Sequence, residues 1–208
     1  MAILVAHRAG NDLERLHEAE ALGIVHVEAD VRLWHGRLEV RHLKTLGPIP
    51  VLWDRWRLAN PFARRLVLAE LLASVSPRTE LILDLKGRNG ELATRVLAAL
   101  GDRRATVCAR DWRLLQSFVD RPNVRLVHSV GTMRQLRRLR RRYAGRQLEG
   151  VSIHERLLDV ATVAELRPVA SFVMTWPVNT LQRAEELVAL GIDGLISDDL
   201  ALAASFGR

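Results

Sequence analysis

The chain of 208 residues is 49% hydrophobic and 26% charged, an ordinary globular composition, and its length suffices for one domain (residues 1–208) with a full core. The net charge of +7 favours anionic partners, and the single cysteine, Cys108, excludes an intrachain disulfide and a cysteine-rich metal site. No apolar run approaches the length of a membrane span, and the N-terminus shows neither the basic region nor the cleavage site of a secretion signal, so we expect a cytoplasmic protein.

Strand-like and helix-like segments alternate along the chain. Most of the strands are continuous apolar runs, which is typical of a parallel sheet covered by helices on both faces. Eight strands, each followed by a helix, predict a single, compact (β/α)8 TIM barrel. The predicted strands cover residues 2–8, 25–33, 80–86, 105–109, 124–129, 150–153, 171–176 and 193–197, and the predicted helices cover 11–22, 61–75, 90–100, 111–120, 131–143, 157–165 and 180–190, with a short helix from Asp199.

The longest interval between predicted strands follows the second strand and runs from residue 34 to 79. Within it, residues 43–62 carry Trp53, Trp56 and three prolines, which limit regular structure. A connection of this length is commonly functional, and loops after barrel strands lie at the mouth. We expect residues 43–62 to form a wall that selects the substrate; the alternative is that both tryptophans pack on the outer helices.

The densest positive charge lies in the predicted helix 131–143. Leu136, Leu139 and Tyr143 fall on one face of this helix and arginines on the other. We favour a solvated face, because no aromatic residues interleave with the arginines as in a surface that binds single-stranded nucleic acid. We therefore expect no nucleic-acid partner, and a weak contact with an anionic membrane is the alternative.

Charged side chains lie two residues apart on two of the predicted strands. Glu28 and Asp30 belong to the second strand, and Asp84 and Lys86 to the third. Residues at i and i+2 of a strand point to the same face, and burying such charges is costly unless they are paired or hold a metal. Carboxylate oxygens suit a hard cation better than zinc. The pattern predicts one divalent cation, Mg²⁺ or Ca²⁺, bound by Glu28, Asp30 and Asp84.

Other polar residues also follow predicted strands. His7 and Arg8 end the first strand, and Ser197 and Asp198 the last. Helix capping explains any one of them, Asp198 for instance, but does not explain their joint position at the end of the barrel where barrel enzymes place their chemistry. Acids for a metal, a histidine for proton transfer and an arginine for a phosphate are the parts of a metal-assisted phosphodiesterase site.

Taken in order, these motifs resemble those of the glycerophosphodiester phosphodiesterase family, whose barrel is related to that of phosphatidylinositol-type phospholipases. The resemblance covers nearly the whole chain, and its strength lies in the order of six motifs that are each weak alone. The motifs are His7-Arg8-Ala9-Gly10, Val27-Glu28-Ala29-Asp30-Val31, the hairpin from His35 to His42, Leu83-Asp84-Leu85-Lys86, Trp176-Pro177-Val178-Asn179 and the segment from Gly191 to Asp198.

The resemblance implies metal-dependent hydrolysis of a glycerophosphodiester to glycerol 3-phosphate and an alcohol. A small glycerophosphodiester or a lysophospholipid is then the substrate. The implied roles are acid–base catalysis by His7 and His42, substrate and phosphate binding by Arg8, Lys86, Trp176 and Asn179, and metal binding by Glu28, Asp30 and Asp84.

The chain also departs from the family pattern. A Pro-Glu-Asn-Thr stretch is missing after the first motif, which leaves Asn11 as the nearest polar candidate, and Leu43 replaces the aspartate after His42. The insertion after strand two is reduced. Asp84 stands where the family has glutamate, a choice that resembles sphingomyelinase D and phospholipase D-like toxins. The alternatives are therefore a phospholipase D-like lipase that forms a cyclic phosphate, and a non-catalytic barrel that binds phosphodiesters.

Overall fold

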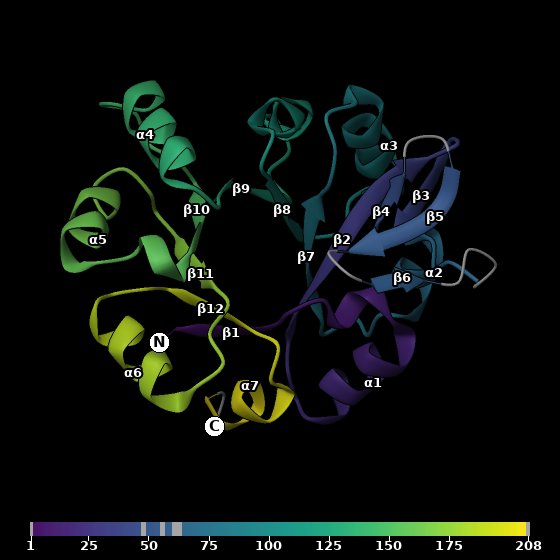
Figure 1. Cartoon of the computed structure of the whole chain (residues 1–208), viewed down its shortest axis with the longest axis horizontal. Coiled ribbons are helices and arrows are strands. Elements are labelled where there is room, and N and C mark those ends of the chain that lie inside the picture. The colour runs from purple at the N-terminus through teal and green to yellow at the C-terminus, as the bar shows by residue number, and fades with distance from the viewer. Residues whose placement is uncertain (1, 47–48, 55–56, 60–63, 207–208) are drawn as a thin grey trace.

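Eight parallel strands close into a barrel surrounded by helices (Figure 1). The computed structural model describes residues 2–46, 49–54, 57–59 and 64–206. Around the barrel the strands follow the order β1, β2, β7, β8, β9, β10, β11 and β12, and β12 pairs with β1. The predicted (β/α)8 barrel is confirmed. Its strands are β1 (Ile3–Ala6), β2 (His26–Trp34), β7 (Glu80–Leu85), β8 (Ala105–Ala109), β9 (Val124–Val130), β10 (Gly150–His154), β11 (Val173–Trp176) and β12 (Gly194–Ser197).

The helices bury their apolar faces against the outside of this barrel, where most of the core lies. Several begin at a polar cap; the side chains of Asp12, Asn89 and Thr132, for example, each accept a hydrogen bond from a first-turn N–H. The helices are η1 (Ala9–Asn11), α1 (Leu13–Ala21), α2 (Leu68–Ser74), α3 (Gly90–Leu100), η2 (Trp112–Phe118), α4 (Met133–Arg142), η3 (Glu155–Leu157), α5 (Val160–Leu166), α6 (Leu181–Ala189) and α7 (Leu200–Phe206).

Two helices differ from their sequence prediction. The segment predicted as a helix over 111–120 contains the 3-10 helix η2, whose buried Trp112, Leu115 and Phe118 recur every three residues, which is the period of a 3-10 helix. Helix α2 begins at Leu68 rather than near residue 61, because the chain before it is held extended by a hydrogen bond from the Val40 N–H to the Leu66 carbonyl.

A hairpin extends β2 beyond the barrel. Strand β3 (Arg37–Val40) pairs antiparallel with the end of β2, and Trp34 lies opposite Arg37. The two turn residues, His35 and Gly36, have φ angles of 45° and 75°, as a type I′ turn requires. This hairpin returns the chain to the barrel so that His42 arrives near the end of β2.

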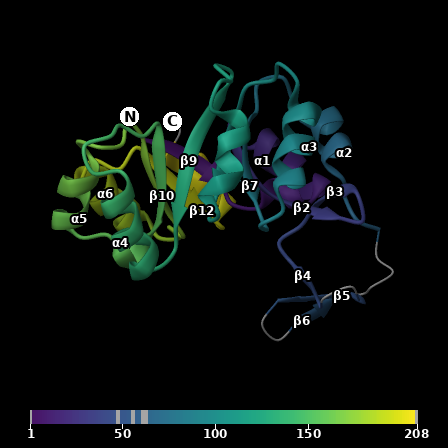
Figure 2. The same cartoon turned by 90° about the horizontal axis from the view of Figure 1, so that it is seen from above.

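The prolines limit regular structure in residues 43–62 less than predicted. The segment contains a three-stranded antiparallel sheet of β4 (Lys44–Leu46), β5 (Ile49–Asp54) and β6 (Arg57–Ala59). Pro50 does not prevent this sheet, because it falls where the register between β4 and β5 shifts. Figure 2 shows the sheet projecting from the barrel. Trp53 belongs to β5, whereas Trp56 lies outside the described residues.

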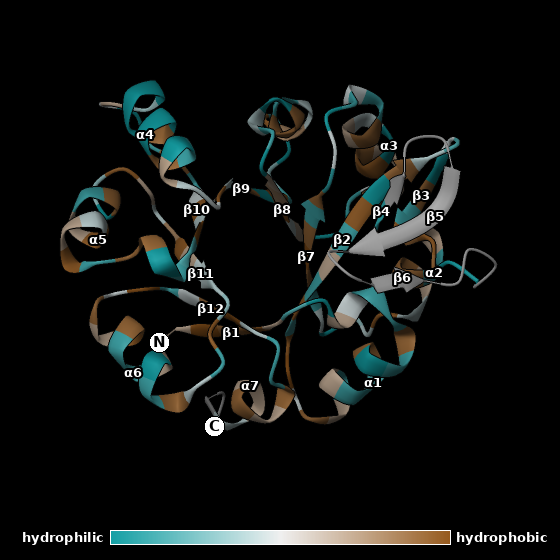
Figure 3. Ribbon diagram, in the orientation of Figure 1, coloured by the Kyte–Doolittle hydropathy of each residue, from teal (hydrophilic) through white to brown (hydrophobic). Residues whose placement is uncertain are grey.

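Helix α4 confirms the predicted amphipathic pattern. Leu136 and Leu139 are buried, while the arginines are exposed, and much of its ribbon is hydrophilic in Figure 3. Some of the charge is engaged: Arg140 pairs with Glu165 at 2.7 Å, and the Arg138 guanidinium lies 5.0 Å from the Trp112 ring centroid. Among the described residues, no helix has the length and apolar character needed to cross a membrane.

Candidate active site

Six barrel strands repeat one pattern inside the barrel. Each supplies an apolar residue to an inner cluster. Two residues further toward the mouth, each supplies a side chain that carries a polar or charged group. The inner cluster of Val5, Ile82, Cys108, Val127, Met174 and Ile196 is thus followed by His7, Asp84, Arg110, Ser129, Trp176 and Asp198. The prediction that Cys108 fills the core is confirmed, and the strand period brings the sequence motifs to one end of the barrel.

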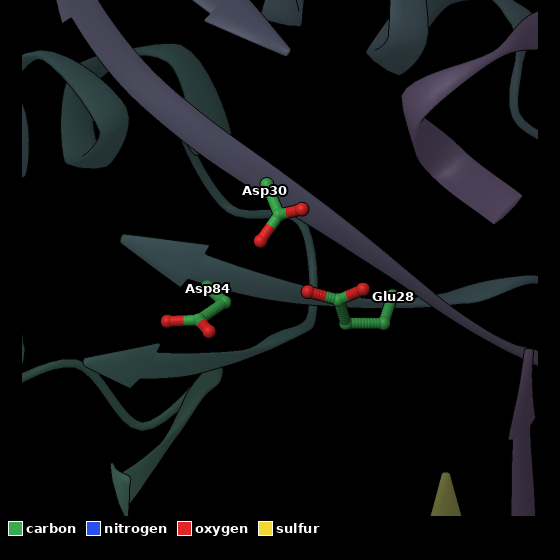
Figure 4. Close-up of side chains that lie close together, drawn as sticks. All are labelled: Glu28, Asp30 and Asp84. Carbon is green, nitrogen blue, oxygen red and sulfur yellow. The ribbon is translucent and has the colours of Figure 1, made fainter. Parts of the chain in front are cut away.

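Three carboxylates converge above this apolar cluster (Figure 4). Asp30 of β2 lies opposite Asp84 of β7 in the strand register, and Glu28 precedes Asp30 on the same strand face. One oxygen of each carboxylate lies within 4.8 Å of the other two. Glu28 is 4% exposed and Asp30 1% exposed. Oδ1 of Asp84 is buried and has no hydrogen-bond partner in the described part of the chain.

Burial and mutual repulsion shape the charges of this group. Burial, aided by the neighbouring Asp30, raises the pKa of Glu28 well above its usual value. Burial would also raise the pKa of Asp30, but the Lys86 ammonium and the hydrogen bond to His42 outweigh it and lower that pKa. Lys86 Nζ lies 2.8 Å from Asp30 Oδ1 and also contacts Asp84, so one ammonium partly compensates two carboxylates.

His7 is positioned by hydrogen bonds to residues near the C-terminus. Its backbone N–H donates to the Ser197 carbonyl, and its ring Nδ1 lies 2.7 Å from Asp198 Oδ1. Because an ionised carboxylate only accepts, Nδ1 carries the proton and Nε2 is left on the side of Glu28, 4.0 Å from Oε2. The hydrogen bond from His7 lowers the pKa of Asp198 to about 2. Asn179 donates to the other Asp198 oxygen at 3.3 Å.

His42 is oriented by Asp30, one of the three convergent carboxylates. Its Nδ1 donates to Asp30 Oδ2 at 3.0 Å, and its Nε2 accepts from Arg8 Nη2 at 3.1 Å. Arg8 has a left-handed backbone, with φ at 55°, a conformation that is costly for a residue other than glycine and is often found at functional sites. This turn directs the Arg8 N–H to Glu28 Oε2 at 2.8 Å.

A cavity of about 850 Å³ opens above the carboxylates. Its lining includes most of the predicted site residues, among them both histidines and the half-buried Trp176. Asn179 is not among the lining residues; its side-chain oxygen accepts from the Asp198 N–H at 3.0 Å. The residues around the opening are His7, Arg8, Arg32, His42, Lys44, Leu85, Lys86, Gly87, Arg88, Arg110, His154, Trp176, Pro177 and Asp198.

Sequence reasoning missed two contributors to this site, Arg88 and Arg110, and assigned no role to two others, Asp198 and Asn11. Asp198 pairs with His7, which a helix cap alone does not explain. The Asn11 side chain both donates to Asp30 Oδ2 at 2.8 Å and accepts from the Asp30 N–H at 2.7 Å, so it fixes a carboxylate of the acid group. Arg88 and Arg110 line the cavity. The inward position of Arg110 follows from its spacing of two from Cys108, a signal that the sequence does contain.

The fold is shared with solved structures of phosphodiesterases. No family model and no curated protein matches the chain by sequence. Among solved structures, a phosphodiesterase from Oleispira antarctica, in complex with the product sn-glycerol-3-phosphate, is similar with a TM-score of 0.78 and 19% identity, over 100% of this chain and 98% of that one.

Two further structures are glycerophosphodiester phosphodiesterases. The Thermotoga maritima enzyme has a TM-score of 0.74 at 20% identity, over 99% of this chain and 98% of that one. The Parabacteroides distasonis enzyme has a TM-score of 0.77 at 17% identity, over 99% of this chain and 96% of that one. The chain therefore shares the glycerophosphodiester phosphodiesterase fold over essentially its whole length, as its motifs led us to expect.

Proposed function

We propose that the protein hydrolyses a glycerophosphodiester to glycerol 3-phosphate and an alcohol. The observation that carries this proposal is the position of two histidines, each oriented by a carboxylate, beside three convergent acids. One histidine removes the proton of the attacking nucleophile, and the other protonates the leaving alkoxide oxygen. Asp198 and Asp30 fix the ring orientations and stabilise the positive charge that each imidazole gains as it takes a proton.

We propose that Glu28, Asp30 and Asp84 hold one divalent cation, Mg²⁺ or Ca²⁺. All the ligand atoms that these residues offer are oxygens, which suits a hard cation. Asp84 Oδ1 has no hydrogen-bond partner in the described part of the chain and the pKa of Glu28 is raised, so the positive charge around the three carboxylates does not balance them. When bound, such a cation neutralises charge that grows on a non-bridging phosphate oxygen. Arg8 and Lys86 share this task with their own N–H groups, since both line the cavity above the acids.

The remaining cavity residues bind the rest of the substrate. We propose that Trp176 packs against the part of the substrate that is not phosphate, since its ring lines the cavity. Asn179 acts through Asp198, which it contacts, rather than by touching the phosphate. We retain the cytoplasm as the location and expect no nucleic-acid partner.

The experiment is phosphorus NMR of the products from glycerophosphodiesters and a lysophospholipid, with Mg²⁺ or Ca²⁺ present. Glycerol 3-phosphate as the first phosphorus-containing product supports the proposal. A cyclic phosphate that accumulates as the final product assigns the phospholipase D-like reaction instead, in which a hydroxyl of the substrate is the nucleophile. If the protein binds the diesters but forms no product with Mg²⁺ or with Ca²⁺, it is a non-catalytic barrel that binds phosphodiesters.

A further inference from the structure

The charges of the three carboxylates and their basic neighbours balance when one divalent cation and one phosphodiester are bound. Three carboxylates face the two cations Arg8 and Lys86. One divalent cation together with one singly charged phosphodiester brings this group to neutrality. Asp198 is the one acid among the described residues that line the opening of the cavity, and its charge balances one further cation. Two more cations at the opening therefore bring more positive charge than a simple glycerophosphodiester requires.

Such an excess is present on two neighbouring strands. Arg88 follows β7 and Arg110 follows β8, and both line the cavity. In the described part of the chain neither guanidinium has a carboxylate within ion-pair distance. The Arg110 guanidinium lies over an aromatic ring, 5.2 Å from the Trp176 ring centroid. Both arginines are exposed to the cavity water, so a ligand can reach them.

The position of Arg110 is fixed by its surroundings. The residue facing its guanidinium on the next strand end is Gly131, where an added Cβ would come within 3.3 Å of Nη2. The Trp176 ring lies 5.2 Å from the guanidinium, and the same ring contacts His154 at 4.6 Å between centroids. These contacts limit the positions that the exposed Arg110 side chain can take, so less of its freedom is lost when it binds an anion.

Other basic residues line the same cavity. They are Arg32 of β2, the strand beside β7, and Lys44 of β4. We propose that Arg88 and Arg110 form a second anion subsite, which selects glycerophosphodiesters whose alcohol carries its own phosphate or carboxylate group. This inference rests on the proposed function and names the substrate class of the same site. Planar guanidinium groups bind phosphates and carboxylates through paired hydrogen bonds.

The test compares four diesters that differ in the alcohol alone: glycerophosphoglycerol, the same compound with a terminal phosphate, the same compound with a terminal carboxylate, and glycerophosphocholine. The kcat/KM values of the two anionic compounds should exceed those of the neutral and cationic ones by ~10-fold or more, since charge-assisted hydrogen bonds are worth roughly 1.5–3 kcal/mol each. The Arg88→Gln/Arg110→Gln double variant should reduce this ratio at least ~5-fold.

The Arg134→Gln variant is the matched control, because it removes an exposed arginine of α4 outside the cavity. It should leave the ratio unchanged. Calorimetric binding of the four intact diesters to His7→Ala measures the same preference without turnover, so failure of catalysis and failure of the subsite are separate results. Equal affinity for all four diesters, or a ratio unchanged in the double variant, would overturn the subsite. Preference for the phosphate over the carboxylate, or the reverse, identifies the second anion.

Discussion

The two histidines at the cavity floor illustrate how single residues are placed by distant parts of the chain. His7 and Asp198 are 191 residues apart yet lie 2.7 Å from each other. The strand period of two predicted Glu28, Asp30 and Asp84 on one side of their strands, and the position at a strand end predicted His7. The roles of Asp198 and Asn11 could not be predicted in this way, because they depend on which strands become neighbours when the barrel closes.

We expect His7→Ala and His42→Ala each to lower kcat by ~10²–10⁴-fold with little change in KM, since the proposed role of each side chain is to transfer a proton at the reacting phosphate. The double variant should lose less than the product of the single losses, because the two act as a unit. Steady-state kinetics on one glycerophosphodiester measure all three. A His42→Ala variant with a near-normal rate would remove His42 from the mechanism.

Glu28→Gln should weaken cation binding without unfolding the protein. The amide oxygen can still accept from the Arg8 N–H, and loss of a buried charge beside Asp30 relieves repulsion when no metal is bound. The melting temperature of the wild type should rise when Mg²⁺ or Ca²⁺ is added, and that of Glu28→Gln should rise much less. Glu14→Gln, an exposed change on α1, is the control. An equal rise in all three proteins would argue against Glu28 as a ligand.

At the scale of elements, the apolar runs predicted all eight barrel strands within a few residues of their ends. The sheet β4–β6 was missed, because prolines usually interrupt strands. Pro50 is tolerated because it lies where the register between β4 and β5 shifts, and this register is known only from the folded structure. The 3-10 character of η2 was missed for a similar reason, since a few apolar residues at mixed spacings fit both helix periods.

A change at Trp53 in β5 tests whether residues 43–62 form a wall that selects the substrate. The first strand of this segment contributes Lys44 to the cavity lining. If the wall selects the substrate, Trp53→Ala keeps its stability and changes the ratio of kcat/KM between small glycerophosphodiesters and lysophospholipids. Trp56→Ala is the companion variant. If instead the tryptophans only pack, stability falls by ~3–5 kcal/mol, as for other buried Trp→Ala changes, and the ratio stays constant. Denaturant unfolding and kinetics on both substrates separate the two.

Helix α4 packs over a buried histidine that makes stability sensitive to acid. His128 of β9 lies 2.8 Å from the Tyr143 hydroxyl, and burial lowers its pKa from 6.5 to about 4. The folded state thus binds fewer protons than the unfolded state, so this contribution is complete above pH 6.5 and is lost as the pH falls toward 4.

Between pH 7.5 and pH 5 the His128→Gln variant should therefore lose ~2 kcal/mol less stability than the wild type. His17→Gln, an exposed change on α1, should follow the wild type. Urea unfolding at both pH values gives the comparison. Parallel losses in wild type and His128→Gln would contradict a buried, neutral His128.

For the whole molecule, the barrel brings two histidines, three carboxylates and several arginines together at one end, where we propose cation-dependent cleavage of glycerophosphodiesters. The most direct measurement is the rate of glycerol 3-phosphate release in EDTA, and again after excess Mg²⁺ or Ca²⁺ is restored. We predict no release in EDTA and recovery with one of the two cations, and no recovery in an Asp84→Asn variant. Full release in EDTA would show that cleavage does not depend on a divalent cation.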